Sequence, residues 1–139
     1  MGIKTVLIAD DEEDVLRMMK RRLSSPSLRV TTVGGGAEAL AAARNQRPDI
    51  IILDYFMPQL DGFETCRALR DDARTRDIPV LMLSGMGSNS DAFTETESGP
   101  DAFLGKPFDW DDLLGWMNVL MLRGRRKSSA SECPASPGT

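Results

Sequence analysis

Acidic side chains are concentrated where the first apolar segment of the chain ends. Five acids follow one another from Asp10 to Asp14, directly after the apolar letters LIA. Asp54 ends a second apolar run, Ser84 ends a third, and Lys106 closely follows a fourth. Carboxylates crowded in a poorly hydrated place repel one another, so these acids need a compensating cation or contact with water.

The apolar runs are predicted to be strands. The runs at Thr5–Ala9, Ile50–Asp54 and Val80–Ser84 lack in–out alternation, which is typical of parallel strands buried on both faces. The run at Arg29–Val33 is β-branched but more polar, which favours an edge strand. Ala102–Gly105 is predicted to be a fifth, short strand.

Segments with a helical spacing of apolar residues lie between and after the strands, at residues 14–24, 37–45, 62–72, 89–98 and 109–122. The fourth of these contains few strong helix formers. The order indicates an α/β fold of the (βα)5 type, a three-layer α/β/α arrangement with a doubly wound parallel sheet and right-handed crossovers. The more polar second strand suits the strand order 2-1-3-4-5, which places it at one edge.

The carboxyl ends of all strands in such a sheet lie on one edge, where ligands bind. Asp10, Asp11, Asp54, Ser84 and Lys106 are therefore expected to converge on one pocket. A helix N-cap could explain one of the first two acids but not both. A single ammonium cannot offset three carboxylates, whereas Mg²⁺ typically takes one or two carboxylates, water and a phosphate oxygen.

The composition excludes several classes of function. The chain has 139 residues, of which 41% are hydrophobic and 27% charged, and this suits one globular domain. It contains no histidine, so neither a Ser-His-Asp triad nor a His-ligated zinc site can form within it. Cys66 and Cys133 are interpreted as free thiols. We find no membrane-spanning run and no signal peptide, and therefore expect a cytoplasmic protein without membrane contact.

Charge is unevenly distributed along the chain. Residues 1–122 carry 13 basic and 20 acidic side chains, which disfavours direct nucleic-acid binding because phosphate contacts require clustered Lys and Arg. Residues 123–139 begin with a basic cluster and continue with Ser, Pro and Gly, which predicts a flexible tail or linker. We therefore expect one domain over residues 1–122, which either stands alone or forms the front piece of a longer protein.

Four separated motifs agree with one known family. LIADDEEDV, LDYFMPQLDGFE, LMLSG and FLGKPF occur in the order and at the spacing found in receiver domains of two-component response regulators. The chain resembles these receiver domains over residues 3–122. The resemblance implies a signalling switch rather than an enzyme with an external substrate, because a receiver catalyses only its own phosphorylation and autodephosphorylation.

The resemblance also assigns roles to residues at the strand ends. Asp54 would be the phosphoacceptor. Asp10, Asp11 and Asp54, together with the main-chain carbonyl of Phe56, would hold Mg²⁺, for which Mn²⁺ could substitute. A histidine kinase or a histidine phosphotransfer protein would donate the phosphoryl group, which is consistent with the absence of histidine from this chain.

Three further residues would take part in switching. Ser84 and Lys106 would bind the phosphoryl group, and the Lys106–Pro107 bond is expected to be cis. Phe103 would swing inward when Ser84 moves; the alternative is an ordinary core residue, because aromatic side chains dominate cores. In this family the face formed by the fourth helix, the fifth strand and the fifth helix often binds a target or a second receiver.

The last helical segment is expected to contribute to that face. Its core side carries Trp110, Leu113, Leu114, Met117 and Met121. Trp116, Val119 and Leu122 fall well away from that side, and three exposed apolar residues on one helix suggest a contact surface. We hypothesise a phosphorylation-dependent contact through this helix, with a homodimer as one form of it.

Two positions beside the predicted site carry no group able to orient water. Phe56 follows Asp54 by two residues, Met86 follows Ser84 by two residues, and both are apolar. In the family these positions flank the phosphoryl group. The hypothesis is that autodephosphorylation is slow.

Two other classes of function remain open. A phosphohydrolase with an aspartate nucleophile would need a second Asp two residues after the nucleophile on the first strand. This chain instead has adjacent Asp10 and Asp11, followed by Glu12. A receiver that binds partners without phosphorylation is disfavoured by the complete set of acids, Ser84 and Lys106.

Overall fold

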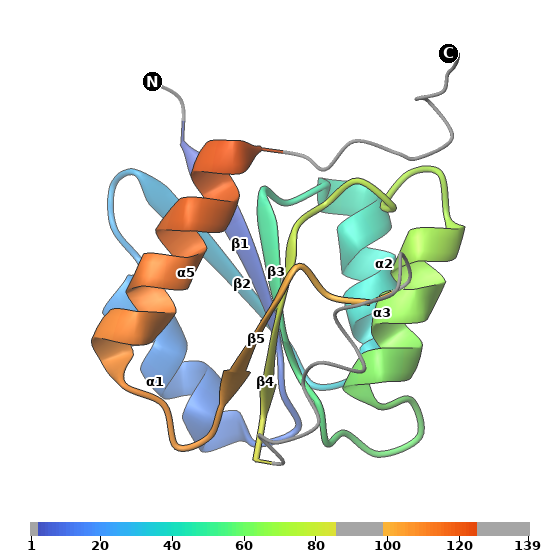
Figure 1. The fold of residues 1–139 in the computed structure, drawn as a ribbon, viewed down its shortest axis with the longest axis horizontal. Coiled ribbons are helices and arrows are strands. Elements are labelled where there is room, and N and C mark those ends of the chain that lie inside the picture. Colours follow the sequence, from blue (N-terminus) through green and yellow to red (C-terminus); the bar gives the residue numbers. More distant parts are fainter. Residues whose placement is uncertain (1–2, 86–98, 125–139) are drawn as a thin grey trace.

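A computed structural model describes residues 3–85 and 99–124 of the chain (Figure 1). The strands are β1 (Lys4–Ala9), β2 (Leu28–Val33), β3 (Ile50–Asp54), β4 (Val80–Ser84) and β5 (Ala102–Gly105). The helices are α1 (Glu13–Leu23), α2 (Gly36–Gln46), α3 (Gly62–Asp71) and α5 (Trp110–Arg123). The helix predicted over residues 89–98 lies outside the described residues.

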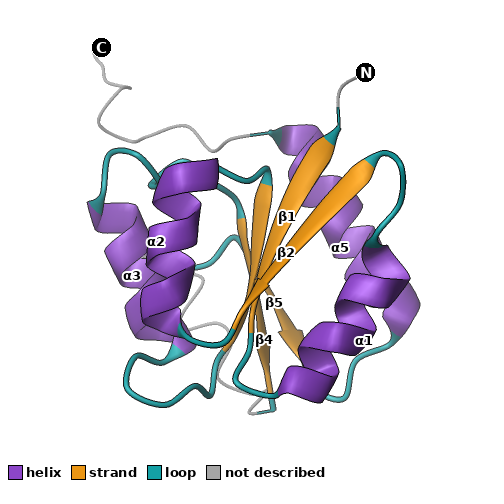
Figure 2. Cartoon of the chain, turned by 180° about the vertical axis from the view of Figure 1, so that it is seen from behind, coloured by secondary structure: helices purple, strands orange, loops and turns teal. Residues whose placement is uncertain are grey.

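The five strands form one parallel sheet in the order β2-β1-β3-β4-β5. Figures 1 and 2 show α1 and α5 on one face of the sheet and α2 and α3 on the other. The predicted α/β fold and strand order are therefore confirmed. The limits of these strands and helices differ from the predicted limits by at most one residue.

A hydrophobic core lies on each face of the sheet. In β1, Val6 and Ile8 pack with residues of α1 and α5, whereas Leu7 and Ala9 pack with residues of α2 and α3. All five residues of β3 are buried. The apolar runs lack in–out alternation because helices cover both faces of the central strands.

Only one of the two adjacent methionines of α1 is buried. Leu16, Met19 and Leu23 are buried at positions i, i+3 and i+7. Met18, which also fits the helical spacing of apolar residues in this segment, is 38% exposed. Consecutive residues lie about 100° apart around a helix, and Met18 therefore turns to solvent when Met19 points into the core.

Helix α5 lies beside α1 on the same face of the sheet. Leu113, Met117 and Leu120 are buried, and Trp110 in the first turn packs against the same core. The guanidinium carbon of Arg22 on α1 lies 4.2 Å from the centre of the Trp110 ring. This cation–π contact links the two helices at the surface.

Cys66 on α3 is a buried free thiol, as predicted, whereas Cys133 lies outside the described residues. Within residues 3–85 and 99–124, no helix has both the length and the apolar character needed to cross a membrane. The boundary between a domain over residues 1–122 and a tail over residues 123–139 stays a prediction, because most of that tail lies outside the described part of the chain.

Candidate functional site

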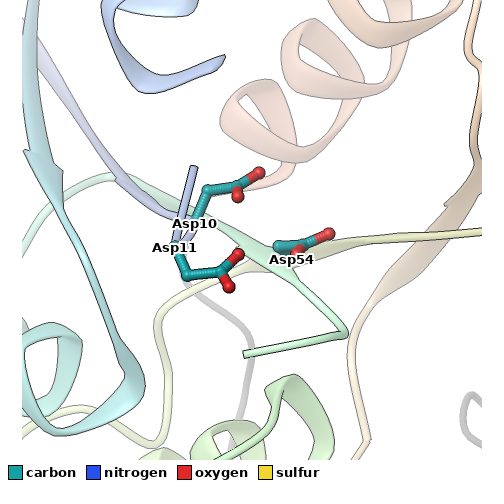
Figure 3. Close-up of side chains that lie close together, drawn as sticks. All are labelled: Asp10, Asp11 and Asp54. Atoms are coloured by element: carbon teal, nitrogen blue, oxygen red, sulfur yellow. The ribbon is translucent and has the colours of Figure 1, made fainter. Parts of the chain in front are cut away.

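Three carboxylates meet at the carboxyl end of the sheet. Asp10 and Asp11 follow β1, Asp54 ends β3, and the pairing of Ala9 with Leu53 places Asp10 next to Asp54. One carboxylate oxygen from each acid lies within 4.8 Å of the other two. Figure 3 shows the three side chains gathered in the same small region. The parallel sheet thus brings together acids that are 44 residues apart in sequence.

Lys106 reaches the same acids from the end of β5. Its Nζ lies 2.6 Å from Oδ1 of Asp54 and 3.6 Å from Oδ2 of Asp10. The backbone holds this position, because the Lys106 amide donates a 2.7 Å hydrogen bond to the carbonyl of Ser84. The Lys106–Pro107 bond is cis, as expected. One ammonium therefore bridges two buried carboxylates.

Burial makes ionisation of these carboxylates costly. It raises the pKa of Asp10, and the hydrogen bond from the Glu12 amide and the charge of Lys106 offset only part of that rise. Burial also raises the pKa of Asp54 against the hydrogen bond from Lys106. The neighbouring charges of Asp10 and Asp11 add to this second rise. Burial alone would lower the pKa of Lys106, but its interactions with Asp54 and Asp10 outweigh burial and raise it.

The two adjacent acids after β1 have different surroundings. Asp10 is 1% exposed, and its Oδ1 accepts a 3.0 Å hydrogen bond from the amide of Glu12, immediately before α1. Asp11 is exposed. The Asp10 side chain therefore holds the turn before α1 but does not cap the helix, whose N-cap is Glu12. Asp11 lies at the solvent side of the acid cluster.

The other residues predicted for this site come from three strand ends. Ser84 at the end of β4 is fully buried. Phe103 on β5 is half-buried and packs against the core that α2 and α3 cover. Phe56 is 58% exposed, and its ring contacts Tyr55 edge to face at 5.0 Å between centroids. Met86 lies outside the described residues. The roles assigned to Ser84, Phe103 and Phe56 stay predictions.

Close backbone packing fixes the loop between β3 and α3. A Cβ at Gly62 would lie 2.6 Å from the carbonyl oxygen of Asp54 and 2.8 Å from Cα of Tyr55. The side chain of Asp61 accepts from the Glu64 amide, and the Glu64 side chain accepts from the Asp61 amide. This capping box starts α3 directly after the loop. Only a residue without a side chain fits between the cap and the end of β3.

The donor set suits a hard divalent cation. Three carboxylates offer oxygen ligands only, and their spacing allows one ion to contact all three. Burial raises the pKa values of Asp10 and Asp54 by more than their contacts with Lys106 lower them, so a further cation would favour the ionised forms. The residues present therefore fit Mg²⁺ or a similar ion.

Comparison with known proteins identifies the family. The family model described as the response regulator receiver domain matches residues 6–118. This chain belongs to that family. Response regulator MprA from Mycobacterium sp. (strain KMS) is 38% identical to this receiver domain over 132 residues, which are 95% of this chain and 55% of MprA. The receiver domain thus spans about half the length of that relative.

Solved structures show the same fold. Chemotaxis response regulator CheY4 of Vibrio cholerae matches with a TM-score of 0.77 and 32% identity, over 86% of this chain and 99% of that one. The receiver domain of sensor histidine kinase PA1611 from Pseudomonas aeruginosa matches with a TM-score of 0.72 and 28% identity, over 86% and 98% of the two chains. The PA1611 structure has a magnesium ion coordinated in its active site cleft.

The receiver domain exposes three apolar side chains on α5. Trp116, Val119 and Leu122 are 41%, 47% and 87% exposed. The prediction that they lie away from the core is therefore confirmed. Their role as a partner surface stays a prediction.

A groove of about 540 Å³ adjoins the acid cluster on the side of α1. Its apolar lining comes from Val15 and Met18 on α1 and from Phe108 and Trp110 after β5, and Lys106 also lines it. This volume falls within the range of about 300 to 1,000 Å³ that is usual for ligand sites. Met18, the exposed methionine of α1, thus belongs to a groove next to the site.

Sequence analysis missed a buried ion pair in this receiver domain. Arg70 and Asp101 have side chains that are 5% and 8% exposed, with 2.9 Å between Arg70 Nη2 and Asp101 Oδ2. A signal was available, because Arg70 follows Cys66 by four residues and so lies on the same face of α3. A charged residue on a buried helix face requires a partner.

Proposed function

We propose that Asp54 is the phosphoacceptor of a two-component or phosphorelay switch. One observation carries this proposal, the arrangement around its carboxylate. Lys106 Nζ lies 2.6 Å from one oxygen, and oxygens of Asp10 and Asp11 lie within 4.8 Å. A carboxylate with a fixed cation and an ion-binding cluster beside it suits attack on phosphorus, which depends mainly on positioning and charge stabilisation.

Asp54, Lys106 and Ser84 would each have a different role in this reaction. A carboxylate oxygen of Asp54 attacks the phosphorus of a phosphohistidine, the P–N bond breaks, and the departing imidazole takes up a proton. The product is an acyl phosphate on Asp54. Lys106, which lies between Asp10 and Asp54, then pairs with a phosphoryl oxygen. Ser84, buried at the end of β4, donates its hydroxyl to another phosphoryl oxygen.

Mg²⁺ would be held by Asp10, Asp11, Asp54 and the main-chain carbonyl of Phe56, and Mn²⁺ could substitute. When bound, the ion supplies positive charge to the phosphoryl oxygens. The oxygen-only donor set and the raised pKa values of Asp10 and Asp54 support this assignment. The magnesium ion in the receiver domain of PA1611 supports it by analogy.

The phosphoryl donor would be a histidine kinase or a histidine phosphotransfer protein, and the lack of histidine in this sequence is consistent with such a donor. We place the donor over the groove beside Lys106. Its lining by Val15, Met18, Phe108 and Trp110 suits the apolar face of a donor helix. A histidine on such a helix would lie near the carboxylate of Asp54.

Phosphorylation would change the face formed by the fourth helix, β5 and α5. The exposed side chains of Trp116, Val119 and Leu122 support a contact there with an output domain, a target or a second copy of the chain. The domain would catalyse only its own phosphorylation and autodephosphorylation. A cytoplasmic location, the absence of membrane contact and the absence of direct nucleic-acid binding stay predictions from the sequence.

Incubation with Mg²⁺ and a small acyl phosphate, followed by measurement of the intact mass, tests the proposal. We expect one added phosphoryl group on the native chain, and none after chelation of Mg²⁺ or in Asp54→Ala. Continuous release of phosphate from a phosphomonoester would instead support a phosphohydrolase. A folded chain that takes up no phosphoryl group under any of these conditions would support partner binding without phosphorylation.

A further inference from the structure

The buried guanidinium of Arg70 contacts the segments that precede two neighbouring strands. Its Nη1 donates to the carbonyl of Arg76 at 3.0 Å and to that of Ile78 at 2.7 Å, just before β4. Its Nε and Nη2 each lie 3.4 Å from the carbonyl oxygen of Gly99, just before β5. Nη2 also donates to Asp101 at 2.9 Å. One side chain on α3 therefore connects the starts of β4 and β5.

Asp101 completes this connection. Its Oδ2 accepts a 2.8 Å hydrogen bond from the amide of Val80, the first residue of β4. Its own amide donates a 2.8 Å hydrogen bond to the carbonyl of Val80. Asp101 immediately precedes β5, so its two hydrogen bonds with Val80 join the start of β5 to the start of β4. The observed register pairs Leu81 with Ala102 and Ser84 with Gly105.

The register of β5 matters for the phosphoryl site because the strand is short. β5 has four residues, and only Ala102 is fully buried. A slip of one residue would displace Lys106 by about 3.3 Å along the strand. It would also exchange the two faces of the strand, so that Phe103 and Leu104 would leave their present cores. A strand of four residues offers few such contacts, and three of its residues are only partly buried.

Buried ion pairs generally contribute little net stability, but they can select one arrangement among alternatives. We propose that Arg70 is a positioning residue for phosphorylation, acting through Asp101 to set the register of β4 and β5 and thereby the place of Lys106 beside Asp54. This inference rests on the proposed function of Asp54. Arg70 lies at the opposite edge of the sheet from the acids and touches no reacting atom.

The rate of phosphorylation, measured in chains with native Lys106 and in chains with Lys106→Met, tests the inference. Arg70→Gln removes the charge and most donors, and Arg67→Gln is the matched control because Arg67 is exposed on the same helix. We expect Arg70→Gln to slow labelling by a small acyl phosphate several-fold at saturating Mg²⁺, and Arg67→Gln to leave the rate unchanged. With Lys106→Met also present, Arg70→Gln should no longer slow labelling. Equal slowing in both backgrounds would overturn the inference.

Amide hydrogen exchange gives a second readout that does not depend on labelling. We expect Arg70→Gln to increase exchange at the Lys106 amide, which donates to Ser84, while amides pairing β1 with β3 keep their protection. Unchanged protection at Lys106 would overturn the inference. If Arg70→Gln does not fold, Asp101→Asn replaces it, with the same expected effects on labelling and exchange, because it removes the negative charge that faces Arg70 but keeps a side-chain oxygen as acceptor for the Val80 amide.

The controls separate this inference from the proposed function. A native chain that takes up no phosphoryl group would overturn both. A native chain and an Arg67→Gln variant that label normally, beside an Arg70→Gln variant that is folded and labels at the native rate, would overturn the inference alone.

Discussion

Phe56 presents an exposed hydrocarbon ring in the loop directly after the aspartate that we propose to be phosphorylated. Its side chain is 58% exposed and lies two residues after Asp54. Hydrolysis of an acyl phosphate requires a water aligned with phosphorus, and positioning of reactants contributes strongly to such rates. A phenyl ring cannot hydrogen-bond that water. We therefore expect a long-lived phosphorylated state.

Phe56→Asn should accelerate autodephosphorylation several-fold, because an amide can hold the attacking water. The measurement is the decay of the phosphorylated mass after removal of the donor, with Mg²⁺ present. Phe56→Leu serves as the control, since it changes shape but adds no hydrogen-bonding group. Equal decay rates of the phosphorylated native, Phe56→Asn and Phe56→Leu chains would reject the hypothesis that Phe56 slows autodephosphorylation. Met86→Glu is the corresponding change at a position outside the described residues.

Gly62 and Gly115 allow a matched comparison of the same substitution. A Cβ at Gly62 would lie 2.6 Å and 2.8 Å from backbone atoms of Asp54 and Tyr55, whereas a Cβ at Gly115 on α5 would meet nothing within 4 Å. Gly62→Ala should lower the free energy of unfolding by about 1–3 kcal/mol, because the backbone must shift. Gly115→Ala should raise it by about 1 kcal/mol through helix propensity.

Denaturant unfolding measures the stability of the Gly62→Ala and Gly115→Ala variants, and Mg²⁺ titrations measure their affinity for the ion. Gly62→Ala should also weaken Mg²⁺ binding, because the displaced backbone carries Asp54 and leads to the carbonyl of Phe56. Gly115→Ala should leave Mg²⁺ affinity unchanged. Equal stability changes in the two variants would contradict the close packing around Gly62.

Helix α5 combines a buried face with an exposed apolar stripe. Leu113, Met117 and Leu120 are buried, while Trp116, Val119 and Leu122 face solvent. If that stripe is a phosphorylation-dependent dimer surface, the acyl-phosphate-treated chain should sediment as a dimer and the untreated chain as a monomer. Trp116→Ala combined with Leu122→Ala should then keep the treated chain monomeric. Monomers at high concentration in both states would argue against dimerisation.

The strands and helices of the described residues could be predicted from the sequence because their signals are local. Continuous apolar runs predicted the buried strands, and the polar character of residues 29–33 indicated the edge strand that is observed. The convergence of Asp10, Asp54 and Lys106 could be expected once the strand order was fixed. The carboxyl ends of parallel strands necessarily share an edge.

Contacts between elements could not be predicted from local patterns. A Cβ at Gly36 would lie 2.8 Å from the carbonyl oxygen of Leu60, yet in the sequence this glycine looks like an ordinary turn residue. Arg70 looks like one more basic residue of a charged helix until the segment around Asp101 is placed against it. Met18 and Met19 fit a helical spacing equally well, so periodicity alone does not show that Met19 is the buried one. These features depend on the distance between elements rather than on periodicity.

At the scale of the whole molecule, the buried carboxylates of Asp10 and Asp54 affect the free energy of unfolding when no cation is bound. Burial raises the pKa values of Asp10 and Asp54, so the folded chain binds protons more tightly than the unfolded chain. Ionisation of these groups therefore lowers the free energy of unfolding. This loss is present at neutral pH, and it disappears as the pH falls through the raised pKa values towards the ordinary value of 3.8.

Asp54→Asn removes one of these charges with little change in shape. Without Mg²⁺ at neutral pH, the variant should therefore melt at a higher temperature than the native chain, and the difference should shrink as the pH falls. Saturating Mg²⁺ should reverse the order, because an ion at 100 times its dissociation constant stabilises the native cluster by about 2.7 kcal/mol. Thermal melts of both proteins over a pH series, with chelator or with Mg²⁺ at matched ionic strength, provide the measurement. A native chain that stays the more stable of the two at neutral pH in chelator would show that the contacts with Lys106 outweigh the cost of burying the ionised acids, and would contradict the raised pKa values of Asp10 and Asp54.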